Sequence, residues 1–190
     1  MLRDVLERDK KFGIIYPGDD TLRHSELPPI GSVGCTVEVI ANQEMPDGRS
    51  NILCAGTTRF FVRRYVEGKL YHQAEVEYFD DELILDDLTE EIAHAEEVFK
   101  QLVAVGKKMR EIDESDMPEL PHDAASLSYI IAASLDVSLE EKQEWLEMTD
   151  PAIRLREVTE RMAGLIEDYE KRVEIQKIAK SNGHGGKLPG

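Results

Sequence analysis

The first part of the chain alternates between apolar and polar residues with the period of a β-strand. Between residues 33 and 39 every second residue is apolar, and Thr36 and Glu38 fall on the opposite face. A period of two predicts a half-buried strand. Further apolar runs, separated by turn sequences such as that at 46–48, occupy residues 12–16, 52–55, 60–66 and 70–79. Short strands joined by tight turns predict a small antiparallel barrel or sandwich.

Helical periodicity appears at both ends of the chain. Residues 1–11 predict a short amphipathic helix, and residues 89–112 carry apolar residues at spacings of three and four. Three helix starts follow, because Asp123, Ser138 with Glu141, and Asp150-Pro151 are favourable caps. The helix that begins after Asp123 is expected to bury four apolar residues, Leu127, Ile130, Ile131 and Leu135. The last helix is expected to run to about residue 180 and to be the longest.

Charge divides the chain at the place where the hydrophobic period changes. The whole chain of 190 residues has a formal net charge of −16. Residues 1–80 hold 10 Lys plus Arg and 13 Asp plus Glu, whereas residues 81–190 hold 13 and 26. This asymmetry favours two structural halves. The expected organisation is a β-rich subdomain at 1–86, a helical bundle at 87–181 and a loose Gly-rich tail at 182–190.

The acidity disfavours nucleic acids as partners, because affinity for them comes mostly from cations that neutralise phosphates. No apolar run is long enough to span a membrane, and residues 1–4 lack the pattern of a signal peptide. Cys35 and Cys54 are too few for a disulfide framework. They fit a reducing cytoplasm, and we expect both to be small buried hydrophobic residues.

Motifs for catalysis or metal binding are weak. The Gly-rich string at 183–187 lacks the first glycine and the final Ser or Thr of a phosphate-binding loop. Glu91 and His94 have the spacing of one half of a di-iron motif, but the second half is missing. We therefore predict no catalytic residue, no metal ligand and no cofactor. A hydrolase or metal enzyme without a recognisable motif stays a third possibility.

One basic stretch is interleaved with aromatic residues. Arg63 and Arg64 lie among Phe60, Phe61 and Tyr65, an arrangement that could stack single-stranded nucleic acid. Two consecutive residues of an alternating strand are expected on opposite faces, however, and acidic residues surround them. Core aromatic residues with solvated charges are the favoured interpretation.

Three ordered segments resemble the N-terminal substrate-recognition domain of Lon proteases. They are a glycine-flanked strand at 31–40, a turn ending in Asp47-Gly48-Arg49, and Gly56-Thr57-Thr58-Arg59-Phe60. The helical half is similar to the family in the stretches 139–143 and 146–147, then at Asp150 and at Arg154-Leu155. The resemblance covers nearly the whole chain, and its specificity lies in the order of the segments.

The resemblance implies a fold and a role. It implies the α+β class, with an antiparallel PUA-like pseudo-barrel followed by a helical bundle that ends in a long helix. It also implies a non-catalytic module that recognises unfolded or degron-bearing proteins. The further partners it implies are a protease or a chaperone, and the implied compartment is a bacterial cytoplasm. The ATPase and peptidase domains have no counterpart here, so a stand-alone module is expected. The family's first strand has no counterpart either, so the expectation is that the chain is truncated or that another segment covers the exposed sheet edge. A homo-oligomer through the last helix also stays open.

The candidate site residues fall into two sets, one of exposed aromatic residues and one of family-motif residues. Tyr65, Tyr71 and Tyr78 are the candidate peptide-binding residues, because exposed tyrosines supply contact area, although core packing is the alternative role. The motif residues expected to build the fold are Gly31, Gly34, Asp47, Gly48, Arg49, Gly56, Arg59 and Phe60. An RNA-binding PUA-like domain is the alternative function, and the net charge argues against it.

Overall fold

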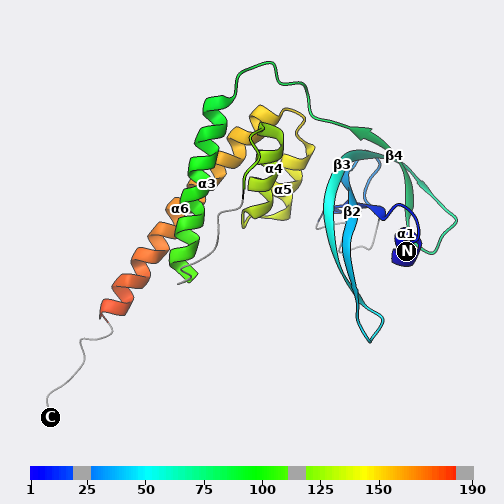
Figure 1. The fold of residues 1–190 in the computed structure, drawn as a ribbon, viewed down its shortest axis with the longest axis horizontal. Helices are drawn as coiled ribbons and strands as arrows, with labels where there is room; N and C mark the ends of the chain where they lie inside the picture. The colour runs from blue at the N-terminus through cyan, green and yellow to red at the C-terminus, as the bar shows by residue number, and fades with distance from the viewer. Residues whose placement is uncertain (19–26, 111–118, 183–190) are drawn as a thin grey trace, which may run out of the picture. The chain divides into compact units, whose positions relative to one another are not determined.

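A computed structural model describes residues 1–18, 27–110 and 119–182. The sequence also predicts a polar, proline-bounded loop at 21–29 and a break between helices at 113–121. These two segments and the expected tail at 182–190 lie wholly or partly outside the described residues. The α+β class is confirmed, because an antiparallel sheet is followed by helices, the last of which is the longest (Figure 1). Residue contacts divide the chain into a sheet unit, Met1–Asp81 with Ser138–Thr149, and a helical unit, Glu82–Val137 with Asp150–Gly190.

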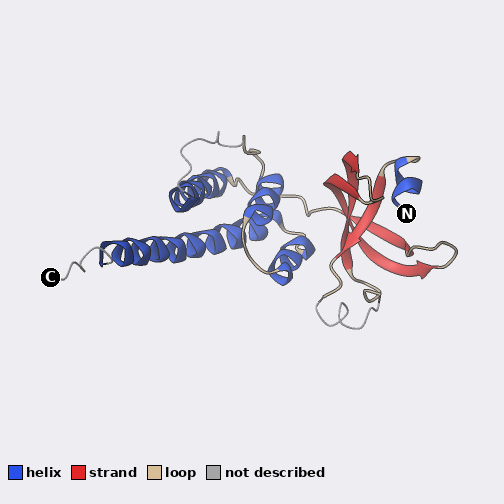
Figure 2. Ribbon diagram, turned by 90° about the horizontal axis from the view of Figure 1, so that it is seen from below, coloured by secondary structure: helices blue, strands red, loops and turns tan. Residues whose placement is uncertain are grey.

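The sheet is a four-stranded antiparallel meander in the order β1-β2-β3-β4 (Figure 2). Its strands are β1 (Lys11–Ile15), β2 (Val33–Glu44), β3 (Ser50–Val66) and β4 (Gln73–Phe79). The predicted strands at 52–55 and 60–66 are one continuous strand, β3. Its pairing with β2 shifts register between Thr36 and Val37 and again between Val39 and Ala41. The first shift leaves Thr57 of β3 as an extra residue and the second leaves Ile40 of β2, and the pairing continues past both.

Helix α1 (Leu2–Leu6) is shorter than the predicted helix at 1–11. The chain turns after it, because Lys10 has a φ of 59° and donates its N–H to the carbonyl of Val5 at 3.0 Å. A positive φ is incompatible with a continuing right-handed helix. The turn leads directly into β1, and the last predicted strand likewise begins later, at Gln73 instead of residue 70.

Helix α5 (Leu139–Glu147) belongs to the sheet unit. Gln143 donates its side-chain amide to the carbonyl of Val33 at 3.1 Å, and Tyr16 donates to the carboxylate of Glu140. Trp145, the single tryptophan, is 5% exposed. The sequence placed this helix within the bundle at 87–181, whereas its contacts are with the strands. The proposed subdomain limits stay a prediction.

Phe60 lies at the centre of the sheet unit and is 2% exposed. A Cβ atom at Gly34 would stand 2.6 Å from Cζ of this ring and 2.7 Å from the carbonyl oxygen of Ile14. Glycine at 34 therefore provides the space in which the Phe60 ring packs. Cys35 and Cys54 are only half-buried, which corrects the expectation that both are buried. Cys54 lies in the part of β3 that extends beyond β4, whereas Cys35 is paired with Ile14 of β1.

The helical unit contains α3 (Thr89–Arg110), α4 (Ala124–Ser134) and α6 (Pro151–Asn182), with α6 packed against both of the others. The three predicted caps are confirmed. Asp123 accepts from the N–H of Ser126 at 2.8 Å, Ser138 accepts from Glu141 at 3.1 Å, and Asp150 accepts from Ala152 at 2.8 Å. Each cap satisfies a backbone donor that the first turn of a helix leaves without a partner.

The helical core is apolar with one buried arginine. Arg154 is 0% exposed, donates its Nε–H to the hydroxyl of Ser128 at 2.9 Å, and lies 3.9 Å from the centre of the Tyr129 ring. Ile130 is 40% exposed and does not point inward as predicted, because α4 buries positions 124, 127, 128, 131 and 132. The surrounding core residues are Leu88, Ala95, Val98, Phe99, Val105, Leu127, Ile131, Leu135, Leu155, Val158, Met162 and Ile166.

Candidate functional site

A cavity of about 690 Å³ lies in the sheet unit. Residues of α1, of both edge strands β1 and β4, and of the central strand β3 contribute to its wall. Since the two edge strands line one cavity, the sheet curves around it. All three candidate tyrosines, Tyr65, Tyr71 and Tyr78, reach this cavity, together with Phe12, Phe60, Ala74 and Val76.

Tyr65 is a half-buried residue of the wall. Its hydroxyl donates to the carbonyl of Pro28 at 2.6 Å, which ties the end of β3 to the segment before β2. Burial raises the pKa of the Tyr65 phenol above its ordinary value, because the charged phenolate is poorly solvated there. The ring is therefore held in place as a neutral, apolar surface.

Tyr71 connects the β3–β4 turn to α1. Its hydroxyl donates to Oδ2 of Asp4 at 3.1 Å, and Nζ of Lys69 lies 3.6 Å from the same oxygen. These two contacts position the short α1 beside the cavity. The hydrogen bond from Tyr71 is the main reason why the pKa of Asp4 lies below its ordinary value, and the charge of Lys69 lowers this pKa further.

Replacing Tyr71 with phenylalanine is expected to raise the pKa of Asp4 towards its ordinary value of 3.8. The substitution removes the hydrogen bond that favours the carboxylate and leaves the ring and Lys69 in place. A carbon-detected NMR titration of the Asp4 carboxyl measures this pKa directly. An unchanged pKa in the Tyr71→Phe variant would contradict the described contact between the β3–β4 turn and α1.

Tyr78 is the most accessible of the three tyrosines, with 59% of its surface exposed. It lies on β4 at the same side as Ala74 and Val76, because alternate residues of a strand face the same way. Among the described residues, β4 pairs only with β3. The cavity therefore opens along a strand edge whose inward side chains are small, aliphatic or aromatic.

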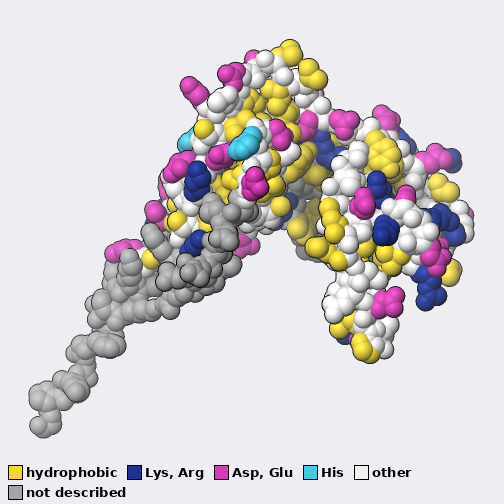
Figure 3. All heavy atoms as spheres, viewed as in Figure 1, with side chains coloured by type: hydrophobic (Ala, Val, Ile, Leu, Met, Phe, Trp, Pro, Cys, Tyr) yellow, Lys and Arg dark blue, Asp and Glu magenta, His cyan; other side chains and the backbone are white. Residues whose placement is uncertain are grey.

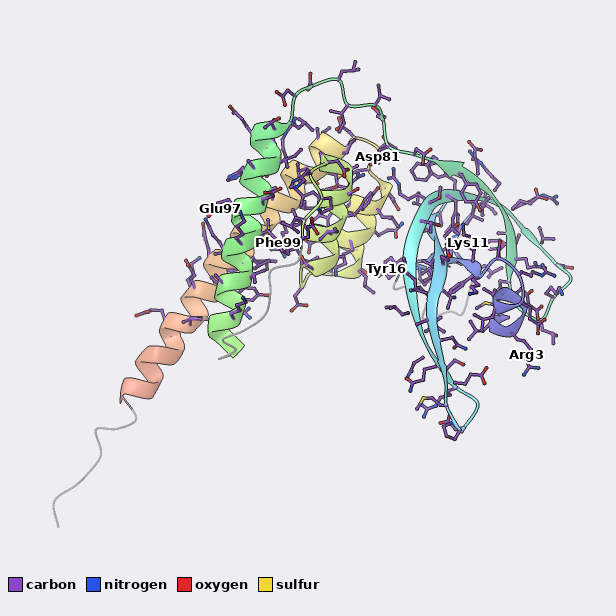
Figure 4. The ribbon with its side chains drawn as sticks, in the orientation of Figure 1. Arg3, Lys11, Tyr16, Asp81, Glu97 and Phe99 are labelled. Atoms are coloured by element: carbon purple, nitrogen blue, oxygen red, sulfur yellow. The ribbon has the colours of Figure 1, made fainter. Side chains whose placement is uncertain are left out.

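Charges of both signs surround the cavity. Arg8, Lys11 and His72 contribute basic groups, and Asp4 and Asp9 contribute acidic ones. Lys11 of β1, labelled in Figure 4, lies 3.9 Å from the carboxylate of Glu38. Figure 3 likewise shows apolar, basic and acidic side chains interspersed over the strands. This mixed surface differs from the strongly acidic average of the chain.

The Asp47-Gly48-Arg49 motif forms the turn between β2 and β3. Asp47 accepts from the N–H of Arg49 at 3.1 Å and pairs with its guanidinium at 2.7 Å, which lowers the pKa of Asp47. Gly48 has a φ of 84°, a conformation that favours glycine. Gly31 has a φ of 91° where the chain enters β2, and Gly56 lies beside Cys35. None of these motif residues lines the cavity.

Arg59 of the same motif set is buried, with 6% of its surface exposed. Its guanidinium donates to the carbonyls of Leu146 at 2.8 Å and Met148 at 2.5 Å, and it pairs with Asp81, which follows β4 (Figure 4). It also lies 4.5 Å from the centre of the Phe79 ring. Arg59 therefore connects β3, the end of β4 and the carboxyl end of α5, where a cation is favourable.

Arg63 and Arg64 lie on the same face of the sheet, contrary to the sequence expectation. Arg63 pairs with Glu77 at 2.5 Å, and Nε of Arg64 donates to Glu75 at 2.7 Å. Glu75 and Glu77 are two residues apart and face one way. The register shift between Val62 and Arg64 explains the difference, because Arg63 is the extra residue of a bulge and Arg64 then lies opposite Glu75.

The helical unit has a smaller hollow of about 200 Å³ between α3 and α6, lined in part by Glu91, His94 and Glu160. Among the described residues, no group of three or more His, Cys, Asp or Glu side chains is arranged to hold a metal ion. No helix within the described ranges is both long and apolar enough to cross a membrane. The tyrosine-lined cavity is thus the stronger candidate site.

Several residues of the cavity wall escaped sequence analysis. Phe12 and Val76 are part of the site, and Phe60 lines it as well as filling the core. The alternation of Ala74, Val76 and Tyr78 is the signal that could have identified the inward face of β4. No sequence signal indicated that α1 contributes to the wall, because this depends on the long-range contact between Tyr71 and Asp4.

Comparison with known proteins identifies the family. The family model described as "ATP-dependent protease La (LON) substrate-binding domain" matches residues 1–164. The Lon protease of Trichlorobacter lovleyi is 29% identical over 165 residues, and that of Paraburkholderia phytofirmans is 28% identical over 178. These matches cover 86% and 90% of this chain but only 20% and 21% of the relatives.

A solved structure gives the same result for the fold. The N-terminal domain of Mycobacterium avium complex Lon protease aligns with a TM-score of 0.56 at 15% sequence identity, covering 80% of this chain and 89% of that one. The predicted resemblance is thereby confirmed. The chain belongs to the LON substrate-binding domain family.

Proposed function

We propose that this protein binds extended segments of other polypeptides in the tyrosine-lined cavity and does so without catalysing a reaction. The observation that carries the proposal is the convergence of Tyr65, Tyr71 and Tyr78 on one cavity beside a strand edge. Its volume of about 690 Å³ is within the range of ligand-binding pockets, roughly 300–1,000 Å³. It has room for several side chains of an extended segment.

The chemistry of the wall suits an unfolded polypeptide. Tyrosine supplies a rigid apolar ring with one polar atom, so it contacts many different side chains at a small entropic cost. Tyr65 and Tyr71 have their hydroxyls occupied by Pro28 and Asp4, which leaves their rings as preformed contact surfaces. Tyr78 is exposed and available to a ligand.

RNA binding is the less favoured function. A protein that binds RNA needs cations for the phosphates, but Arg63 and Arg64 are paired with Glu77 and Glu75. The net charge of −16 adds a general repulsion. Within the cavity, the acidic Asp4 and Asp9 accompany the basic groups, which weakens the attraction of the cavity for phosphates.

The clients and the enzyme that processes them are part of the proposal. The relatives are Lon proteases, of which this chain spans about a fifth of the length. Substrate binding that presents unfolded or degron-bearing proteins to a protease or chaperone is consistent with the family. The cytoplasm is the expected compartment for this activity.

Replacing Tyr78 with serine is expected to weaken the binding of unfolded polypeptides by about tenfold, because an exposed aromatic contact of this kind is typical of binding hot spots. The measurement is fluorescence anisotropy with a library of labelled unstructured peptides, titrated with the full chain. Since Tyr78 is largely exposed, the variant is expected to fold normally, as circular dichroism would verify.

The matched control is Tyr169→Ser, which removes a tyrosine from α6 in the helical unit. It is expected to leave peptide binding unchanged. Equal losses in both variants, or no peptide binding by the unaltered protein, would rule out the cavity as the binding site.

A further inference from the structure

The outer edge of β4 has the geometry of a strand-addition site. We define it as the side of Gln73–Phe79 that faces away from β3. Among the described residues no strand pairs with it, and it contains neither proline nor glycine. Proline and lysine are among the residues that commonly protect the edge strands of soluble proteins, and β4 has neither, its two charged residues being glutamates. An accessible edge beside a cavity therefore points to a ligand that pairs with the main chain.

The direction of the main-chain groups can be followed from β3. Val62 donates its N–H to the carbonyl of Ser32 at 3.0 Å and accepts from the N–H of Gly31 at 2.8 Å, so both of its polar groups point towards the β2 side. In an antiparallel sheet this direction alternates from residue to residue. The main-chain N–H and C=O of Phe61, which lies opposite Glu77, therefore point towards β4.

The same alternation continues along β4. Since Glu77 is paired with Phe61, its main-chain N–H and C=O point towards β3. The main-chain groups of its neighbours Val76 and Tyr78 therefore point towards the outer edge. Both residues also direct their side chains into the cavity wall. A strand that pairs with this edge would consequently place every second side chain in the cavity.

The opposite face of β4 gives the added strand a charge preference. Glu75 and Glu77 lie on this outer face, with 56% and 60% of their side chains exposed. Side chains directly opposite each other on neighbouring strands interact. Glu75 and Glu77 are paired with Arg64 and Arg63 of β3, but each carboxylate retains further acceptor positions. Because the glutamates lie on β4 itself and the arginines one strand further away, an added strand meets the carboxylates first, which favours a basic residue over an acidic one.

The edge of β1 is a weaker alternative. It has five residues, includes Gly13 in its middle and begins with Lys11, features that weaken or protect a strand edge. A second copy of the chain is also unsuitable on β4. Antiparallel pairing of two β4 edges centred on Val76 would place Glu75 of each copy opposite Glu77 of the other, with like charges adjacent.

We propose that the outer edge of β4 binds extended segments in which apolar residues alternate with lysine or arginine, by adding the segment as a fifth strand. The proposal rests on the proposed function and specifies its ligand. Apolar side chains enter the cavity beside Val76 and Tyr78, and basic side chains pair with Glu75 and Glu77. The main chain supplies affinity, and the alternation supplies selectivity.

The test uses nine-residue peptides and the full chain in fluorescence anisotropy titrations. A peptide of alternating valine and lysine is expected to bind about fivefold or more tightly than a shuffled peptide of the same composition, and more tightly than one alternating valine and glutamate. The double variant Glu75→Gln/Glu77→Gln is expected to reduce the preference for lysine over glutamate. The control Glu44→Gln/Glu157→Gln, with the same charge change elsewhere, should keep it.

Methylation of the peptide nitrogens tests the pairing itself. Strand addition predicts that methyl groups at one alternating set of positions weaken binding about tenfold, and that the other set is tolerated. Equal effects at both sets, or a charge preference unaffected by Glu75→Gln/Glu77→Gln, would overturn the inference. If either of these results were obtained while Tyr78→Ser still weakened peptide binding, only the strand-addition inference would fail and the proposed function would stand. Concentration-dependent dimerisation that blocks the peptide would assign the edge to a second copy and overturn the inference.

Discussion

Replacing Arg59 with methionine is expected to lower the free energy of unfolding by about 3–5 kcal/mol, because it removes the cation from a buried network. The change leaves the carboxylate of Asp81 and the carbonyls of Leu146 and Met148 without this donor. Buried acceptors that lose a hydrogen bond carry the full cost of their desolvation. Urea denaturation of the full chain measures the loss.

Trp145 provides a second, local measurement. It is the only tryptophan, is 5% exposed and lies in α5, whose carboxyl end Arg59 contacts. We expect its emission to shift to longer wavelength in the Arg59→Met variant before global unfolding. Arg49→Met is the matched control, because the Arg49 side chain is 77% exposed. Equal stability and unchanged emission in both variants would contradict the described role of Arg59.

Replacing Arg154 with alanine is expected to destabilise the helical unit by about 3 kcal/mol or more, through a cavity in the core and the loss of buried polar contacts. Arg154 is 0% exposed and contacts Ser128 and the Tyr129 ring. It therefore connects α6 to α4. Thermal unfolding followed by circular dichroism at a helical wavelength measures the effect.

Arg156→Ala is the control for this prediction. Arg156 is two residues away on the same helix and is exposed, so both variants share the change in helix propensity. We expect the control to shift stability by no more than about 0.5 kcal/mol. An Arg154→Ala variant as stable as the control would show that the buried arginine is dispensable for packing α6 against α4.

Features that depend on neighbouring residues were predictable from the sequence. Asp123, Ser138 and Asp150 each cap the helix that follows, because capping needs only a short polar side chain and the next few backbone donors. The alternation at 33–39 likewise predicted a strand correctly. The ordered motifs led to the right family for the same reason, since they mark turns and strand ends.

Features that depend on distant contacts were not predictable. The bulge between Val62 and Arg64 reverses the expected placement of Arg63, and it is defined only by pairing with β4. The position of α5 depends on Arg59, which is 87 residues from the carbonyl it contacts at Leu146. The tyrosines could be identified as candidates, but their common cavity arises from the curvature of the whole sheet.

The central claim is that the cavity of the sheet unit holds an extended polypeptide segment. Photo-crosslinking tests it most directly, with a valine–lysine peptide in which one valine is replaced by benzoylphenylalanine, followed by mass spectrometry of the modified chain. The account predicts adducts within residues 71–78 and within α1 or β1, whose side chains line the cavity. Adducts confined to residues 89–110, 119–137 and 150–182 of the helical unit, with none on the strands, would contradict it.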